Sequence, residues 1–244
     1  MYSAGSLQAA EAPPVYNATY CLQSSGLITN FTSERGCNLA GSPSYALPTK
    51  ANNYVGSFGT IDVTGILNGK YGTLATPSLP PDQLAGGIYY CPGDLTINAP
   101  ITFQNSNGAA RANGLVVVKG TLTINADLDY QNRNESDLKN LASIGWVVLK
   151  QNDGSGGNVV VNGAVTKVVG AFFAEDTIST GDGTSQLDAT GIFVAKNFNL
   201  QRQFSSRTTG SEKVTFDARA ILNPPPGLSD ATRSLPGFRS VPGQ

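Results

Sequence analysis

Residues 87–105 read GIYYCPGDLTINAPITFQN, and residues 114–132 read GLVVVKGTLTINADLDYQN. The second stretch repeats the first at an offset of 27 residues, with nine of the 19 positions identical. Each copy combines a short apolar run, a glycine and the alternating sequence Leu-Thr-Ile, which is typical of short β-strands separated by tight turns. A repeat of this kind indicates a solenoid, in which each copy buries its apolar side against the next.

The repeat continues downstream in a weaker form, as a glycine followed by four mostly apolar residues and a charged one. These copies are GWVVLK from residue 145, GAFFAE from residue 170 and GIFVAK from residue 191. Equivalent residues of a solenoid stack in columns, so Leu95 should lie on Leu122, and Trp146 should lie on Leu115. Because glycine tolerates tight turns, one column of turns should consist of five glycines. They are Gly87, Gly114, Gly145, Gly170 and Gly191.

We therefore predict an all-β protein whose main part is a parallel right-handed β-helix (β-solenoid) of about five coils. The alternative is an antiparallel β-sandwich in which each unit forms a hairpin. Residues 1–55 lack the pattern and should form a loop-rich N-terminal cap over an open sheet edge. Residues 56–222 form the predicted solenoid domain, beginning with a degenerate coil, and residues 223–244 form a Pro/Gly-rich C-terminal tail.

Composition excludes several classes of function. The 244 residues include no histidine, which removes His-based acid–base catalysis and His-ligated metal sites. The formal net charge is −1 and no block of Lys and Arg occurs, so we expect no nucleic-acid partner. No apolar run is long enough to cross a membrane. We therefore predict that the chain is not an enzyme, uses no cofactor and contains no membrane segment.

Two groups of side chains are candidates for special roles. Cys21 and Cys37 lie in the loop-rich N-terminal segment, where a disulfide would brace a region with little core, although free or buried thiols are the alternative. Asp176, Asp182 and Asp188 are spaced six residues apart and form a possible carbohydrate site, because paired carboxylates hydrolyse glycosides. Turn residues are the simpler interpretation of these aspartates. Carboxylates in Gly-rich loops also suit calcium, but no EF-hand spacing is present.

The aromatic residues of the apolar runs have two possible roles. They could fill the core of the solenoid, or they could line an outward face on which sugar rings stack. The residues concerned are Tyr89, Tyr90, Trp146, Phe172, Phe173 and Phe193. Cys91 lies in the same run and is expected to be a small core residue.

The repeated stretch GDLTINAPITF/GTLTINADLDY is similar to the β-helical repeats of bacterial cell-surface and pilus-associated proteins. The unit at residues 196–200, followed by EKVTFDARAILNPPPG, resembles the way such ectodomains end before a Pro-rich tail. The resemblance implies an exported, extracellular or cell-surface protein with a structural, adhesive or filament-forming role. Self-association or contact with other surface proteins is then expected, and a carbohydrate-binding or carbohydrate-active β-helix with a glycan ligand is the alternative.

Overall fold

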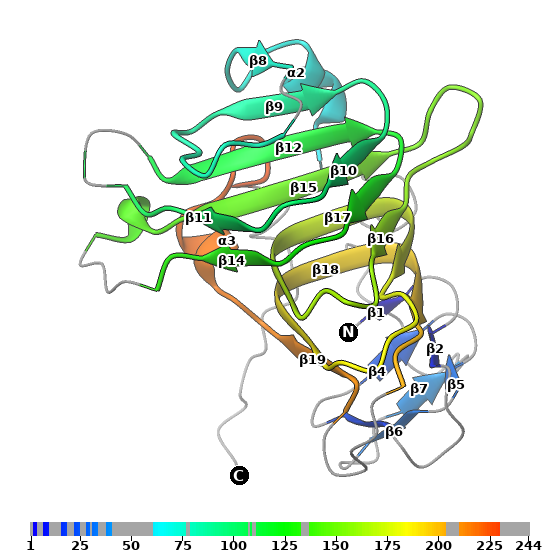
Figure 1. Ribbon diagram of the computed structural model, residues 1–244. Helices are drawn as coiled ribbons and strands as arrows, with labels where there is room; N and C mark the ends of the chain where they lie inside the picture. The colour runs from blue at the N-terminus through cyan, green and yellow to red at the C-terminus, as the bar shows by residue number, and fades with distance from the viewer. Residues whose placement is uncertain are drawn as a thin grey trace, which may run out of the picture.

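The structure is a computed structural model of the chain, and its described residues fall into two parts. Side chains are described for 61–76, 79–106, 108, 111–132, 137–203 and 210–229, and the backbone alone for seven short strands between residues 2 and 40. Within these residues the molecule is mainly β-stranded, with few and short helices, and its largest sheet is strongly curved (Figure 1).

The largest sheet contains one long column of parallel strands. Its order is β7-β4-β1-β18-β17-β15-β12-β9-β8, and each neighbouring pair is parallel. The bounds are β7 Asn38–Ala40, β4 Leu22–Ser24, β1 Tyr2–Ser3, β18 Leu187–Leu200, β17 Lys167–Ser179, β15 Ser143–Leu149, β12 Asn113–Lys119, β9 Ile88–Cys91 and β8 Leu74–Ala75. This parallel pairing confirms an all-β, parallel fold and excludes the antiparallel sandwich.

The remaining strands form further parallel columns beside the first. A second column runs β10-β13-β16, continues through the C-terminal parts of β17 and β18, and ends in β2 and β5. β11 pairs with β14, β19 pairs with the N-terminal part of β18, and β3 pairs with β6. The bounds are β10 Leu95–Ile97, β13 Leu122–Ile124, β16 Val159–Val161, β2 Leu7–Ala9, β5 Ile28–Thr29, β11 Ile101–Phe103, β14 Leu128–Tyr130, β19 Glu212–Thr215, β3 Tyr16–Ala18 and β6 Phe31–Ser33.

The two copies of the decisive repeat stack in register, as their identical sequences predict. Leu95 pairs with Leu122, and the Leu-Thr-Ile stretches of β10 and β13 align residue by residue before β16 continues the column. Leu95 and Leu122 are buried in an interior cluster, while Thr96 between the buried positions is exposed. The alternation of side chains in a strand therefore directs the apolar residues inward and the threonines outward.

The third apolar run is shifted by one residue from the predicted alignment. Gly145 pairs with Leu115 and Ala171, whereas Trp146 pairs with Val116 and Phe172. A slip of one residue moves every side chain to the other face of a sheet. The observed register places Trp146 in the interior, fully buried among apolar side chains, so the prediction that Trp146 lies on Leu115 was wrong.

The five repeated glycines do not form the predicted column of turns. Four of them lie inside strands, and Gly170 pairs with Gly191, while Gly145 faces Leu115. These four are Gly114, Gly145, Gly170 and Gly191. Their common property is close approach: a Cβ on Gly145 would lie 2.6 Å from Leu228 Cδ1, and a Cβ on Gly191 would collide with the Gly170 carbonyl group.

Both faces of the main sheet are buried. Val116 and Val118 of β12 point into the interior cluster, whereas Leu115 and Val117 belong to a second, outer cluster, and all four are fully buried. The outer cluster includes Leu228 from the C-terminal segment and residues of α2 (Val63–Leu67). Burial on both sides explains why these strands read as continuous apolar runs without alternation.

The segment expected to form a degenerate first coil contains a helix instead. Asp62 caps α2 by accepting a hydrogen bond from the Gly65 N–H at 2.8 Å, and Ile66 is buried in the outer cluster. The other helices are also short: η1 is Leu138–Asn140 and α3 is Arg219–Leu222. Of the predicted tail, residues 223–229 are described, and Leu228 packs against Gly145 on the main sheet.

A fully buried arginine joins the turns of successive strand layers. Arg202 follows β18, and its guanidinium donates hydrogen bonds to the carbonyl oxygens of Asn162 at 2.9 Å, Thr180 at 3.1 Å and Ser185 at 3.1 Å. Its backbone N–H donates to Glu212 Oε1 at 3.0 Å. Burial lowers the pKa of Arg202, and the nearby charge of Glu212 opposes that shift. The guanidinium thus joins the turn after β16, which contains Asn162, to the turn between β17 and β18, which contains both Thr180 and Ser185.

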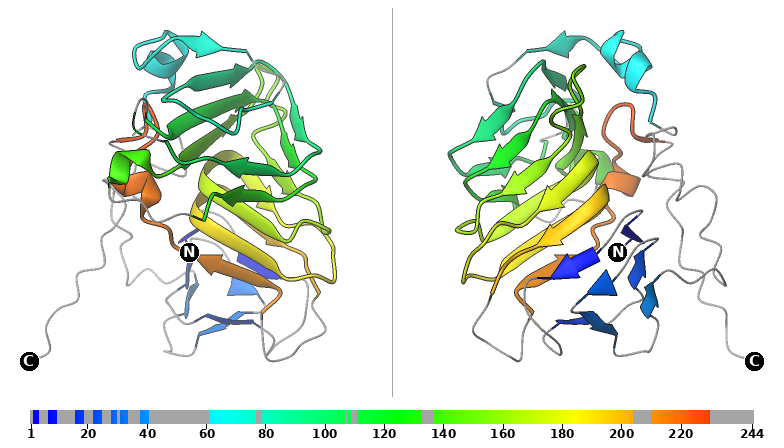
Figure 2. Two further views of the ribbon diagram at one scale, coloured as in Figure 1. Left: turned by 60° about the vertical axis from the view of Figure 1, so that its left-hand side comes forward. Right: turned by 90° about the vertical axis from the view of Figure 1, so that its right-hand side faces the viewer.

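The predicted N-terminal cap region continues the stack at one end. β1 pairs with β18, the last long strand of the body, and β4 and β7 follow it in the sheet order. Figure 2 shows these strands, drawn in blue, beside the yellow and orange strands β18 and β19. The N-terminal strands therefore cover the edge of β18 and not the edge of β9, where the sequence repeat begins.

Candidate functional site

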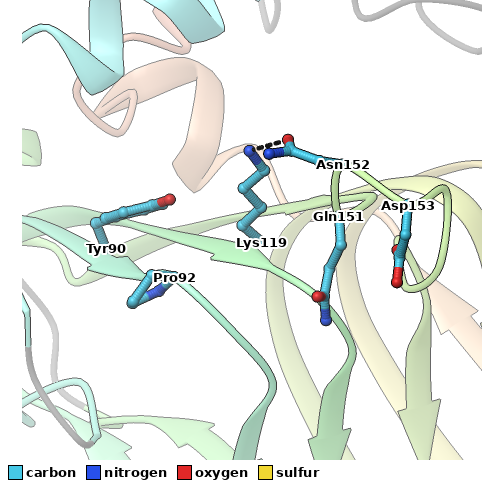
Figure 3. A pocket seen from close by; sticks show the side chains of 6 residues that line it. All are labelled: Tyr90, Pro92, Lys119, Gln151, Asn152 and Asp153. Atoms are coloured by element: carbon cyan, nitrogen blue, oxygen red, sulfur yellow. Dashed lines mark hydrogen bonds between the residues drawn. The ribbon is translucent and has the colours of Figure 1, made fainter.

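The described surface contains an open hollow of about 370 Å³ at one corner of the stack. Its lining residues come from β9 and the turn that follows it, from the end of β12 and from the loop between β15 and β16 (Figure 3). They are Tyr90, Pro92, Lys119, Gln151, Asn152 and Asp153. The volume lies within the range of small-ligand sites.

The loop that forms one wall of the hollow is held by its own hydrogen bonds. Lys150 and Gly156 form an isolated antiparallel bridge, and the Gln151 N–H donates to the Ser155 carbonyl oxygen at 2.7 Å. The Gly154 N–H donates back to the Gln151 carbonyl oxygen at 3.0 Å, and Gly154 has a φ of 84°. The Asn-Asp-Gly sequence suits this turn because Asn and Asp favour turns and glycine accepts a positive φ.

The polar groups of the hollow are fixed by local contacts. Lys119 Nζ donates to Asn152 Oδ1 at 2.7 Å, which joins the end of β12 to the loop. Asp153 accepts hydrogen bonds from the Ser155 hydroxyl at 2.7 Å and the Ser155 N–H at 2.9 Å, and these bonds lower the pKa of the Asp153 carboxyl. Asp153 therefore presents an ionised carboxylate, while Lys119 presents an ammonium group.

This arrangement suits binding of a sugar better than cleavage of one. Figure 3 shows Tyr90 and Pro92 on one side of Lys119, with Gln151 and Asp153 on the other. An aromatic ring can pack against the apolar face of a sugar, and amide, ammonium and carboxylate groups can bond its hydroxyls. Glycoside hydrolysis needs two carboxyl groups, whereas Asp153 is the only carboxylate among the lining residues.

The three aspartates of the sequence-predicted carbohydrate site have separate surroundings. Asp176 Oδ2 forms an ion pair with Lys150 at 2.8 Å, and Asp188 Oδ2 forms one with Lys213 at 3.1 Å. Asp182 lies in the turn between β17 and β18. Among the described residues, no three His, Cys, Asp or Glu side chains are grouped so that they could hold a metal ion. The structure therefore does not bring these aspartates together as one acidic site.

The electrostatic role of Asp176 is structural. Burial alone would raise the pKa of its carboxyl, but the hydrogen bond and the charge of Lys150 outweigh burial, and the pKa is lowered. Asp188 belongs to a row of alternating charges on β14, β17, β18 and β19. In this row, Lys167 contacts Asp129 at 2.8 Å and pairs in register with Asp188. Exposed pairs of this kind stabilise little individually, but their alternation favours one register of the strands.

The aromatic residues divide between the two faces of the main sheet. Trp146, Phe172 and Phe193 stack in the interior, with ring centroids 5.7 and 5.2 Å apart. Phe173 is buried in the outer cluster, whereas Tyr90 packs partly against that cluster and reaches the hollow. The apolar runs therefore supply mostly core residues, as one of the two sequence interpretations predicts.

Among the cysteines, Cys91 is described and is a buried core residue, as predicted. Burial raises the pKa of its thiol, which makes the reactive thiolate scarce at neutral pH. Cys21 and Cys37 lie outside the described residues. The residues that follow them, Leu22 and Asn38, are register partners on the parallel strands β4 and β7.

We predict that Cys21 and Cys37 form a disulfide, because neighbouring strands are spaced within the Cα distance that a disulfide bridges. Without reductant, the intact mass should lie about 2 Da below that of the reduced chain, which is the mass of the two hydrogens lost on forming the bond. A peptide digest should contain one species that joins both cysteines. Alkylation of Cys21 and Cys37 in the native, unreduced protein would contradict this prediction.

Comparison of the chain with protein-family models, with curated proteins and with solved structures gave no significant match. Within the part of the chain that the structure describes, none of the helices has the length and apolar character needed to span a bilayer.

Proposed function

We propose that this chain is an extracellular structural module, built as a right-handed β-solenoid of about five coils, that assembles into a surface layer, pilus-associated structure or filament. The observation that supports it best is the main sheet, whose strands β9, β12, β15, β17 and β18 stack in parallel and are buried on both faces. Such a stack is rigid and ends in strand edges, which can extend by pairing with further strands. Its proposed partners are further copies of the chain and other surface proteins.

The test is the size of the particle at rising protein concentration. Light scattering after size-exclusion chromatography, followed by negative-stain microscopy of the same sample, should find ordered polymers as the concentration approaches the millimolar range. The width of such polymers should stay constant, because growth occurs only at the strand edges. A strictly monomeric chain of 25.4 kDa throughout this range would contradict the structural proposal.

A second candidate function is glycan binding at the hollow beside Tyr90. It rests on the partly exposed ring of Tyr90 among Lys119, Gln151 and Asp153. Glycan-array screening of the purified protein should identify a ligand. The Tyr90→Ala variant should then bind about fivefold to tenfold more weakly, because loss of one ring contact is worth about 1 to 1.4 kcal/mol.

The matched control for this prediction is Tyr71→Ala. Tyr71 is also partly exposed, at 37%, but it follows α2 and does not line the hollow. Its replacement should leave glycan binding unchanged. Equal losses in both variants, or unchanged binding in Tyr90→Ala, would exclude the hollow as the binding site.

A further inference from the structure

The layer beyond β18 is built from both ends of the chain. β19 pairs with the first part of β18, after which the chain leaves the stack through α3. The next places along the same strand are taken by β1, where Ser3 pairs with Ala195, and by β2, where residues 7–9 pair with residues 198–200. A layer that a solenoid normally forms from one continuous segment is thus shared between two segments with no direct connection (Figure 2).

The route from these N-terminal strands to the rest of the body is long. β7 ends at Ala40, and the body begins beside β9, seven strand spacings away in the sheet order. At about 4.8 Å per spacing, this separation is about 34 Å. Residues 41–60 lie outside the described part of the chain, and a connection of their length can span up to about 70 Å. The chain can therefore make the connection, but it must return along the whole stack.

A second copy offers a more direct path. If β1–β7 of one copy pair with β18 of another, the β9 end of the first copy can face the β18 end of the second. The strands then follow one another in sequence order, from β19 of one copy to β1, β4, β7 and β9 of the next. The same backbone hydrogen bonds form, and the connection no longer spans the stack.

We propose that the edge of β18 is completed by β1 and β2 of a second copy, so that copies link head to tail by exchange of their N-terminal strands. This inference rests on the proposed structural function and names the interface that carries it. Each copy gives one set of strands and receives another, so the contact is heterologous and the assembly is open-ended. The strands of the second copy supply the main-chain hydrogen bonds that the edge of β18 loses when its own N-terminal strands leave.

Exposed apolar side chains adjoin the proposed interface. Val214 of β19 is 46% exposed, and Phe216, two residues later, is 61% exposed. Leu222 at the end of α3 is 50% exposed. Exposed large apolar side chains next to a sheet edge are suited to contact with another protein. Of these residues, Val214 lies on β19, which pairs with β18 in the layer that the N-terminal strands complete.

In the closed arrangement β18 pairs with the N-terminal strands of its own copy, and in the exchanged arrangement it pairs with those of another copy. Both arrangements contain the same strand pairs, so the protein concentration decides between them. Because the N-terminal strands are covalently joined to the body, they are held near their own β18 at an effective concentration of about 1 mM. Dilute protein should therefore be closed and monomeric. Protein concentrations above about 1 mM, as on a densely covered surface, favour exchange between copies.

The test uses two variants that each carry one added cysteine. Gln8 and Asn199 are register partners on β2 and β18, so Gln8→Cys and Asn199→Cys place thiols on neighbouring strands. The two full-length variants are mixed, refolded together and oxidised at several concentrations. A linked dimer with twice the 25.4 kDa mass requires exchange between copies, because neither chain contains both added cysteines. Its fraction should rise more than tenfold between about 10 µM and 1 mM.

Three controls accompany the mixture. The double variant Gln8→Cys/Asn199→Cys should link within one chain when dilute, which tests the pairing of β2 with β18. Val160→Cys replaces Asn199→Cys in a matched mixture; Val160 is 37% exposed on β16, a strand that does not pair with β2, so no dimer should form. The unsubstituted chain shows how much dimer forms through the natural cysteines. Each single variant alone shows how much dimer forms between two copies of the same added cysteine.

The outcomes separate this inference from the proposed function. A dimer in the mixture, absent from the Val160→Cys control, supports strand exchange. Polymers without that dimer overturn strand exchange but leave the structural function standing. A double variant that links only within one chain, together with a mixture that stays monomeric up to about 1 mM, overturns both.

Discussion

Replacing Gly191 by alanine should lower the free energy of unfolding by about 4 kcal/mol, among the largest effects of a single substitution. A Cβ at this position would collide with the carbonyl oxygen of Gly170 and lie 2.8 Å from its carbonyl carbon. These are backbone atoms of the register partner, so they cannot rotate away as a side chain could. The φ of 152° at Gly191 adds strain for any residue with a side chain.

Gly93→Ala is the matched control for this substitution. A Cβ on Gly93 would meet no atom within 4 Å, and its backbone is not left-handed. The control should change stability by less than about 0.5 kcal/mol. Urea unfolding followed by circular dichroism measures the free energy of unfolding of both variants. In a thermal unfolding experiment, the melting temperature of Gly191→Ala should lie about 10 °C below that of the parent. Equal stability of the two variants would show that β17 and β18 do not approach so closely.

Arg202→Met should be nearly as destabilising, at about 3 kcal/mol. Methionine fills a similar length but cannot donate a hydrogen bond, so the carbonyl groups of Asn162, Thr180 and Ser185 each lose a donor inside the protein. Arg202→Lys should recover only part of the loss. The lysine ammonium keeps the charge, but it lacks the planar fork that reaches three carbonyl oxygens in two turns.

The control for Arg202 is Arg111→Met, since Arg111 is exposed. Its replacement should leave the unfolding midpoint within about 1 °C of the parent. Native-state hydrogen exchange adds a local measurement, because Arg202→Met should raise exchange in the turns after β16 and β17 before it affects β12. If the turns after β16 and β17 exchange as slowly in Arg202→Met as in the parent, other contacts hold these turns.

The repeat predicts the core well where its side chains alternate. Leu-Thr-Ile in β10 and β13 has one apolar face, so its inward and outward residues follow directly from the sequence. The neighbouring run at residues 145–149 is apolar at nearly every position because both faces of its strand are buried. Alternation is then absent, so the sequence allows either Gly145 or Trp146 to pair with Leu115. Only the packing of Trp146 in the interior and the close approach at Gly145 select the first of these registers.

Other features depend on contacts that no local pattern records. The N-terminal strands are only two or three residues long, and β4 contains Gln and Ser, so they lack an apolar signal. The hollow combines Tyr90, Lys119 and Asp153, which come from three separate segments. The loop at 151–157 is visible in the sequence as a Gly-rich insertion between repeats, but its position beside Tyr90 follows from strand stacking.

The shared layer at β18 also sets an order for folding. Neighbouring strand layers join residues roughly 20 to 40 apart, whereas the contact of Ser3 with Ala195 closes nearly the whole chain and costs about 2 kcal/mol more in loop entropy. We expect the central coils to form first and the N-terminal strands to dock last. During synthesis these strands leave the ribosome before their partner exists. They are therefore unpaired for the longest time, which is when a neighbouring nascent chain can meet them.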